Sequence, residues 1–442
     1  MSDDLRSAIR AAMPAARADL ERLVRIPSVA FPGYPAGPVR EAAEATRDIL
    51  AAAGYQQTRL LEIEGGQPAV YGEIPGPPGT PTVLFYAHYD VQPAGDGWTG
   101  DAFEPTERDG RLRGRGTADD KSGIIMHALA ARAYGGRPPV GVKVIVEGEE
   151  ETGASKLEAQ IADYRDLLQA DVIVVADTGN WKLGEPTLTT TLRGVVKATV
   201  EVRTLEKAVH SGLFGGPTPD ALTALVKMLA ALYDEAGNTI IPGLERQPWD
   251  GMAYPEDEFR QQAGILPGVG LAGGGSLSEQ LWVSPAAAII GLDAPRVEGA
   301  GNALVPRARA TIALRLPPGE DPTSAFGLLE RHLRAAAPWQ VQVDVVCDGV
   351  GSGFAADTAQ RAFGAARRAL EASYGTEAVL MGSGGSIPLI SGLAATFPAA
   401  AIVLWGVEDP DAGIHGPNEG VDLSELERMA LAEALLLKEL AG

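Results

Sequence analysis

The feature that most constrains this fold is a regular alternation of short apolar runs and helical runs between residues 82 and 177. The apolar runs TVLFYAH, VGVKVIVEGEE and ADVIVVAD are rich in β-branched residues, and segments such as KSGIIMHALAARAY separate them. This βαβ rhythm is typical of a largely parallel sheet covered by helices. Each apolar run ends in acids or a histidine. Because ligands bind at the carboxyl ends of the strands in open α/β sheets, these polar residues are expected to converge at one site.

The character of the sequence changes near residue 188, where TLTTTLRGVVKATVEVRT alternates in the manner of antiparallel strands with one solvated face. A helix near residues 219–235, the strand ARATIALRL, a helix over 324–336 and the strand VQVDVV follow. The glycines of 349–353 predict a flexible joint, after which a helix over 358–373 and the strand AAIVLWG are expected. We therefore predict an α/β fold with a mostly parallel sheet flanked by helices, formed by residues 1–187 and 353–442. An α+β two-layer sandwich, residues 188–352, is inserted into it.

Composition excludes several classes of partner. The chain of 442 residues carries 58 acidic against 37 basic side chains, for a net charge of −21, and has no Lys/Arg-rich run. Nucleic acid and anionic membranes are therefore not expected to bind. The single cysteine, Cys347, excludes an intrachain disulfide and fits a reducing compartment. Residues 1–30 have helical spacing and no continuous apolar stretch for a signal peptide or membrane span, so a cytoplasmic location is expected.

The strand end FYAHYD places His88 and Asp90 two residues apart, on one face of the strand. A histidine that binds a metal usually donates its other ring N–H to a carboxylate, which fixes its tautomer. Asp90 suits that role. By itself the pair is weak support for a metal site, because such spacings also arise by chance.

Further acids and a histidine follow the other predicted strands. Asp119 lies in the glycine-rich loop GRGTADDKSG, EGEEETG places four acids within five positions, Asp177 ends ADVIVVAD, and His415 follows the last apolar strand. Adjacent glutamates at the end of a buried strand repel one another unless a cation or donors compensate them. A bound metal is the simplest compensation.

Each of these motifs also has a plain structural explanation. Asp119 suits a helix cap, the glutamate run suits a solvated turn, and a polar residue often ends a strand. Taken singly, those explanations are favoured; it is the occurrence of acids and histidines at four strand ends that favours a metal site. We expect His127, within an apolar helix, to be a packing residue and His332 to face solvent.

With these residues in view, the chain resembles the dinuclear metallohydrolases that include aminoacylase, glutamate carboxypeptidase, succinyl-diaminopimelate desuccinylase and the carnosinase-like dipeptidases. The resemblance covers nearly the whole chain and is closest to the dipeptidase branch. Its motifs occur in the family's order: LERLVRIPSVA, HYDVQP, GRGTADDKSG, EGEEETG, VAD, VHSGLFGG, NALVPRARATIALRLPPGEDP, GGSIP and HGPNE.

The resemblance implies two divalent metal ions per subunit, zinc first, with manganese or cobalt as alternatives. It assigns His88, Asp119 and Asp177 to one ion, with Asp119 bridging to a second ion held by Glu151 and His415.

Catalytic roles are implied as well. Glu150 would activate a water that bridges the metals and attacks the amide carbonyl, then return the proton to the leaving amine. Asp90 would orient His88. The bond between Asp119 and Asp120 matches a position that is a cis peptide in relatives.

The resemblance also implies residues outside the metal centre. His210 in VHSG and Asn302 in GNALVP match residues that relatives bring into the active site from the smaller domain of a second subunit, which implies a homodimer and a lid or dimerisation role for the insert. Arg315 and Ser386 match positions that bind the substrate's carboxylate, and a guanidinium fork suits that task.

The expected activity is therefore that of a metal-dependent exopeptidase acting on dipeptides or short peptides with a free C-terminal carboxylate. An N-acyl-amino-acid amidohydrolase with the same metals is the alternative. Carnosinase-like dipeptidases often carry a glutamate before GGSIP, where it can meet a substrate amine, and this chain has Ser383. An inactive binding protein is disfavoured because every expected ligand and the base are present.

Overall fold

The computed structural model describes residues 2–153, 155–385 and 387–442. Its internal contacts divide the chain into two compact units. The first unit runs to Thr190 and resumes over Ala356–Met381 and from Ile387 to the end of the chain. The second unit comprises Thr191–Ala355 and a short stretch that begins at Gly382.

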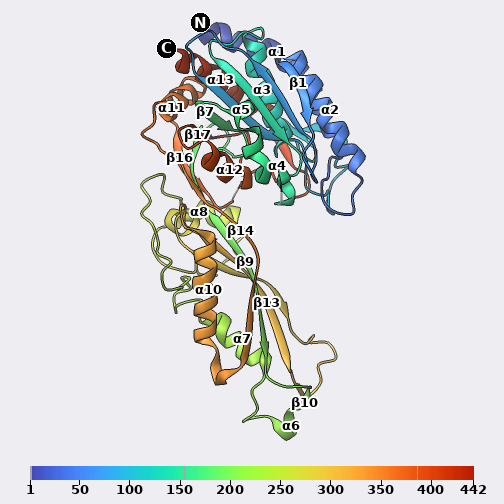
Figure 1. Ribbon diagram of the computed structural model, residues 1–442, viewed down its shortest axis with the longest axis vertical. Helices are drawn as coiled ribbons and strands as arrows, with labels where there is room; N and C mark the ends of the chain where they lie inside the picture. Colours follow the sequence, from blue (N-terminus) through green and yellow to red (C-terminus); the bar gives the residue numbers. More distant parts are fainter. Residues whose placement is uncertain (1, 154, 386) are drawn as a thin grey trace. The chain divides into compact units, whose positions relative to one another are not determined.

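The first unit contains a twisted sheet and the helices that cover it (Figure 1). Its strands are β1 (Gln56–Leu61), β2 (Ala69–Ile74), β3 (Thr82–His88), β4 (Thr106–Arg108), β5 (Arg111–Arg113), β6 (Gly141–Glu147), β7 (Val172–Val175), β8 (Thr187–Leu192), β16 (Val379–Ser383), β17 (Ala401–Leu404) and β18 (Gly420–Asp422), of which β8 and β16 continue into the second unit. Its helices are α1 (Ser2–Val24), α2 (Ala36–Ala52), α3 (Lys121–Ala133), η1 (Glu150–Thr152), α4 (Lys156–Gln160), η2 (Ile161–Tyr164), α5 (Arg165–Leu168), α11 (Arg361–Tyr374), α12 (Pro388–Thr396) and α13 (Leu423–Ala441).

Strand order explains why the predicted site residues meet. The main sheet of the first unit runs β1-β2-β6-β3-β7-β17-β8. The four central strands β6, β3, β7 and β17 are parallel, so their carboxyl ends lie at one edge. These strands are buried along almost their whole length, which is why their sequences are continuously apolar rather than alternating.

The core of the first unit lies between this sheet and a layer of helices. Helices α1, α3 and α13 pack against one another, α3 also contacts β3, and α11 contacts both α13 and β17. Apolar residues at helical spacing, such as Ile9, Leu20, Leu23 and Leu436, are fully buried in this layer. The expected N-terminal amphipathic helix is thus present as α1, and His127 is a buried packing residue of α3.

The second unit is built on a four-stranded antiparallel sheet of order β11-β13-β9-β14. Its strands are β9 (Gly194–Arg203), β10 (Val209–His210), β11 (Ala286–Asp293), β12 (Ala303–Leu304), β13 (Arg307–Leu316), β14 (Gln342–Gly351) and β15 (Phe354–Ala355), and its helices are α6 (Ser211–Phe214), α7 (Ala221–Ala230), α8 (Glu256–Gln262), α9 (Leu277–Trp282), α10 (Pro322–Ala336) and η3 (Pro338–Gln340). Helices α7 and α10 cover one face, against which alternate residues of β9 and β13 are buried.

The predicted fold class is confirmed: a mostly parallel sheet with helices is accompanied by a separate antiparallel sheet. Some local expectations were wrong. The glycines near 349–353 do not form a loop throughout, because β14 continues to Gly351. His332 is half-buried rather than solvent-facing, and its Nε2 lies 2.7 Å from the carbonyl of Ala231. None of the described helices has the length and apolar character needed to span a membrane.

Candidate metal centre

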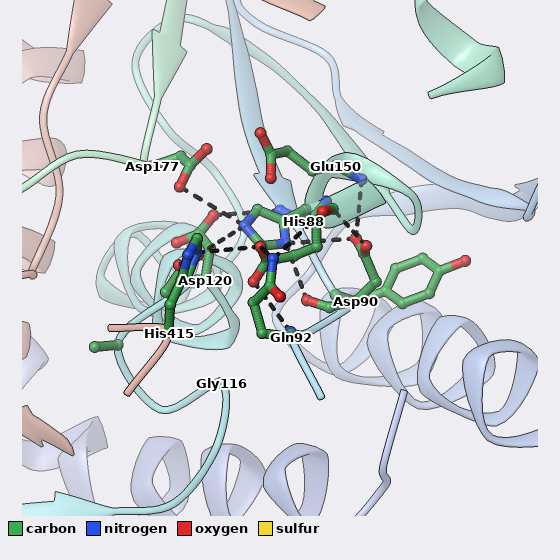
Figure 2. Close-up of polar contacts among 12 residues, drawn as sticks. His88, Asp90, Gln92, Gly116, Asp120, Glu150, Asp177 and His415 are labelled. Carbon is green, nitrogen blue, oxygen red and sulfur yellow. Dashed lines mark hydrogen bonds and ion pairs between the residues drawn. The ribbon is translucent and has the colours of Figure 1, made fainter. Parts of the chain in front are cut away.

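Polar side chains from five separate segments meet at the carboxyl edge of the main sheet. They come from the end of β3, the loop before α3, η1 after β6, the segment after β7, and the loop after β17, and are His88, Asp119, Glu151, Asp177 and His415. Figure 2 labels three of them, His88, Asp177 and His415. All lie within the first unit. The structure therefore brings together every residue that the sequence proposed as a metal ligand.

His88 is fully buried and held from both ring nitrogens. Nδ1 lies 3.0 Å from the carbonyl oxygen of Asp90 and 3.5 Å from its carboxylate, so the side chain and the backbone of Asp90 both face the ring. The Asp90 carboxylate also accepts hydrogen bonds of 3.1 Å from the backbone N–H groups of Glu150 and Glu151. Asp90 thus fixes the histidine and the glutamate turn at once, beyond the single role that the sequence proposed.

Nε2 of His88 faces two carboxylates, 3.0 Å from Asp119 and 3.6 Å from Asp177. Burial lowers the pKa of His88, but hydrogen bonds to the surrounding carboxylates, Asp119 first, outweigh it and raise the pKa well above its usual value. Burial raises the pKa of Asp177 to about 6, although His88 acts in the opposite direction. The peptide bond between Asp119 and Asp120 is cis, as expected.

The second oxygen of Asp119 faces His415, whose Nε2 lies 3.0 Å away and also 3.2 Å from Glu151. Hydrogen bonds to these two carboxylates raise the pKa of His415 to about 10. Asp119 therefore has one oxygen toward each histidine, the arrangement required of a bridging ligand. Gln92 holds Glu151 in place, with its side-chain amide donating to Glu151 at 2.7 Å. Sequence reasoning missed Gln92, although it lies within the HYDVQP motif.

Glu150 lies beside the ligands but has a different environment. Burial, followed by the negative charge of Asp177, raises the pKa of Glu150 well above its usual value. Its carboxylate makes no hydrogen bond or ion pair with the part of the chain that the structure describes. The neighbouring Glu149 is not part of the ligand cluster, and its carboxylate accepts a hydrogen bond from the backbone N–H of Lys156. The structure thus places the three consecutive glutamates in three different environments.

Glu408 is a further carboxylate at the cluster that sequence reasoning missed. One of its oxygens lies within 4.8 Å of oxygens of Asp119 and Asp177. Its backbone is anchored on both sides: its carbonyl accepts from Asn180 at 2.7 Å, and the next residue, Asp409, forms a buried bidentate ion pair with Arg111. Burial raises the pKa of Glu408 well above its usual value.

Glu419 joins two segments of the site that lie 300 residues apart. It is fully buried, pairs with Arg115 at 2.7 Å, and accepts from the backbone N–H groups of Gly116, Ala118 and Asp119. Arg115 in turn donates to the carbonyl of His415. Glu419 therefore connects the HGPNE segment to the loop that carries Asp119. The acid ends a motif that the sequence identified, but its partners could not be read from the motif.

The donor set fits divalent cations. Five carboxylates (Asp119, Glu150, Glu151, Asp177, Glu408) face two imidazoles. Burial first, and then the charge of neighbouring carboxylates, raise the pKa values of Glu150, Asp177 and Glu408, and a bound cation would offset both effects. Imidazole nitrogens with carboxylate oxygens are ligands for zinc and for neighbouring first-row metals. Two sets can be drawn around Asp119, one with His88 and Asp177 and one with Glu151 and His415.

His210 and Asn302 lie together in the second unit. β10 pairs with β12 so that His210 is opposite Ala303, and the carbonyl of Asn302 accepts from the N–H of Ser211 at 2.9 Å. Both side chains are exposed. Nδ1 of His210 accepts from the backbone N–H of Gly212 at 3.0 Å, so the neutral ring carries its proton on Nε2.

Arg315 lies on β13 of the same unit, half-buried and opposite Val195 of β9. Burial lowers its pKa. Ser386, the other residue expected to bind the substrate carboxylate, lies outside the described residues.

Comparison with known proteins agrees with this geometry. The model of peptidase family M20/M25/M40 matches residues 84–439. Cysteinylglycine-S-conjugate dipeptidase from Corynebacterium striatum is 41% identical over 366 residues, which cover 81% of this chain and 80% of that protein. Cys-Gly metallodipeptidase DUG1 from Saccharomyces cerevisiae is 26% identical, over 92% of this chain and 91% of its own length. The crystal structure of human carnosine dipeptidase 1 superposes with a TM-score of 0.81 at 25% identity, covering 100% of this chain and 98% of that one.

Proposed function

The chain belongs to peptidase family M20/M25/M40 and is a metallopeptidase of that family, and from this we propose that it is a dipeptidase with two metal ions that hydrolyses dipeptides bearing a free C-terminal carboxylate. The observation that carries the proposal is Asp119, whose two oxygens face two different histidines. The similarity to a cysteinylglycine conjugate dipeptidase, a Cys-Gly metallodipeptidase and a carnosine dipeptidase supports dipeptides as the substrate class.

His88, Asp119 and Asp177 would hold one metal ion, and Asp119, Glu151 and His415 the other. Zinc is the first choice for this donor set, with manganese or cobalt as alternatives. Bound ions would act as Lewis acids at the scissile carbonyl and make hydroxide available near neutral pH.

Glu150 is the proposed general base. Its carboxylate is free of other described partners, and the raised pKa moves its proton affinity toward that of a base working near neutral pH. It takes a proton from the attacking water, whose oxygen forms a bond to the carbonyl carbon. The same proton then passes from Glu150 to the amide nitrogen as the C–N bond breaks. The products are an amine and a carboxylic acid, and the acid releases the second proton of the water to solvent.

His210 would stabilise the negative charge that forms on the carbonyl oxygen. The Gly212 N–H fixes the tautomer of His210 and leaves Nε2–H as a donor, which is what an oxyanion requires. We propose, as the family resemblance implies, that His210 and Asn302 act at the active site of a second subunit in a homodimer, with the second unit serving as dimerisation domain and lid.

Mixing two inactive variants tests this sharing. If Glu150 and His210 act across subunits, a hybrid dimer of E150Q and H210A contains one complete site, and random exchange restores about a quarter of wild-type activity. If both residues act within one subunit, every hybrid site is defective and the mixture stays inactive. Activity is measured after unfolding and refolding the two variants together, with each variant treated alone as the control.

The deacylase alternative is favoured by one observation, Ser383, which stands where related dipeptidases often carry an amine-binding glutamate. Glu408 can supply the missing carboxylate, because it lies at the ligand cluster without a described partner and on an anchored loop. We expect dipeptides to be cleaved faster than N-acetyl or N-succinyl amino acids, and E408Q to reduce kcat/KM for dipeptides but not for acylated substrates. Faster turnover of acylated substrates by the wild type would refute the dipeptidase proposal.

A further inference from the structure

Arg193 and Arg315 lie at one end of the second unit's sheet, Arg193 just before β9 and Arg315 on β13. Arg315 pairs with Val195 across the antiparallel ladder between β13 and β9, and Arg193 comes two residues before Val195. Arg193 lies just before β9, which begins at Gly194, and the positive charge of Arg315 acts on the Arg193 guanidinium, so the two side chains lie near each other at this end of the ladder. Arg315 lies on the face opposite helices α7 and α10, because the adjacent position Leu314 is buried in the core on the helix side.

Neither guanidinium has an anionic partner among the residues that the structure describes. Within residues 2–153, 155–385 and 387–442, the side chain of Arg193 makes one hydrogen bond, to the carbonyl of Gln280 at 3.4 Å, and its buried Nε has no partner. Burial, and then the positive charge of Arg315, lower the pKa of Arg193 to about 10. Two half-buried cations near each other without a carboxylate are unfavourable, and an anion bound between them would offset their repulsion.

The glycine segment that follows β16 lies directly against Arg193. The backbone N–H of Arg193 donates to the carbonyl of Ser383 at 3.3 Å, and a Cβ added at Gly384 would lie 3.5 Å from Nη2 of Arg193. At Gly382 a Cβ would lie 2.4 Å from the ring of Trp282, which is buried, so no side chain fits there. Arg193 and Trp282 therefore hold this segment in place from two positions.

We propose that Arg193 acts with Arg315 as a two-guanidinium site for the C-terminal carboxylate of the substrate. The inference rests on the proposed function, which supplies a substrate with one such carboxylate. The buried Nε of Arg193 and the half-buried guanidinium of Arg315 have no anionic partner among the described residues, so they provide donors that a substrate carboxylate can satisfy. Charge-assisted bonds from guanidinium to carboxylate are the strong class of hydrogen bond, so the pair would select peptides with a free carboxyl end.

Paired substrates test this assignment directly. A dipeptide and the same dipeptide with a C-terminal amide are compared in wild type, R193Q and R193K. We expect R193Q to lower kcat/KM for the free acid about 10- to 100-fold, mainly through KM, and to change the amide rate little. R193K should recover part of the loss because it keeps the charge but not the planar fork. R309Q is the matched control, since Arg309 lies on β13 but pairs with the exposed Asp293.

An equal loss on acid and amide substrates would overturn the proposal and show that Arg193 only supports the local structure. A wild type that cleaves acid and amide equally well would also overturn it, while leaving the dipeptidase proposal intact. If the wild type cleaves no dipeptide, the proposed function fails instead. In that case calorimetry with glycine, which bears the same carboxylate, still tests whether Arg193 binds a carboxylate. R193Q should weaken the affinity for glycine about 10-fold or more, and an unchanged affinity would contradict the assignment.

Discussion

Replacing Glu150 with glutamine is expected to reduce kcat about 10²- to 10⁴-fold while leaving the metal content of the protein unchanged. The amide of glutamine has the size of the carboxylate but cannot take a proton from water. The Glu150 side chain has no hydrogen-bond partner in the described structure, so the change breaks no contact that supports the fold. Steady-state kinetics on a dipeptide measure kcat, and elemental analysis of the same sample measures the metal content.

Glu149 provides the matched control for this experiment. It is the adjacent glutamate, and its carboxylate meets the backbone of Lys156 instead of the ligand cluster. E149Q should therefore turn over at nearly the wild-type rate. A large loss in E149Q with normal turnover in E150Q would place the base one residue earlier. Loss of metal from E150Q would instead make Glu150 a ligand, a role its proximity to His88 and Asp177 also permits.

The sequence could predict the elements of the site because they are local. Continuously apolar strands signalled a buried parallel sheet, and polar residues at their ends then had to meet at one edge, as His88 and Asp177 do. The residues that hold those ligands could not be predicted in the same way. Glu419 and Arg115 are 304 positions apart, and no periodicity or spacing reports such a pair.

Other omissions have similar causes. Strand β11 went unrecognised because it is an exposed edge strand whose run AAAIIGLD lacks the alternation expected of a half-buried strand. Arg193 lies between β8 and β9, and only the pairing of β9 with β13 brings Arg315 to the same end of the sheet. Glu408 lies in a turn with other acidic residues, a composition typical of a solvent-exposed turn. Only the contacts of Asn180 and Arg111 show that this turn is anchored at the cluster.

Replacing Glu419 with glutamine is expected to destabilise the protein by about 3–5 kcal/mol and to weaken metal binding about 10- to 100-fold. Arg115, which is 1% exposed, would lose its only described anionic partner and remain buried. The loop carrying Asp119 would also lose a charged acceptor for three backbone N–H groups. Urea unfolding of the metal-free protein measures the change in stability separately from metal binding. A competitive chelator titration measures the change in metal affinity.

The control for Glu419 is a second glutamate paired with an arginine, in an exposed setting. Glu427 on α13 pairs with Arg10 at 3.2 Å, and the Arg10 side chain is 70% exposed. Because exposed ion pairs contribute about 0–1 kcal/mol, E427Q should change stability little and metal affinity not at all. If E419Q were no more destabilising than E427Q, the buried pair would add nothing to stability. If E419Q unfolded more easily but bound metal normally, Glu419 would support the fold without setting the position of Asp119.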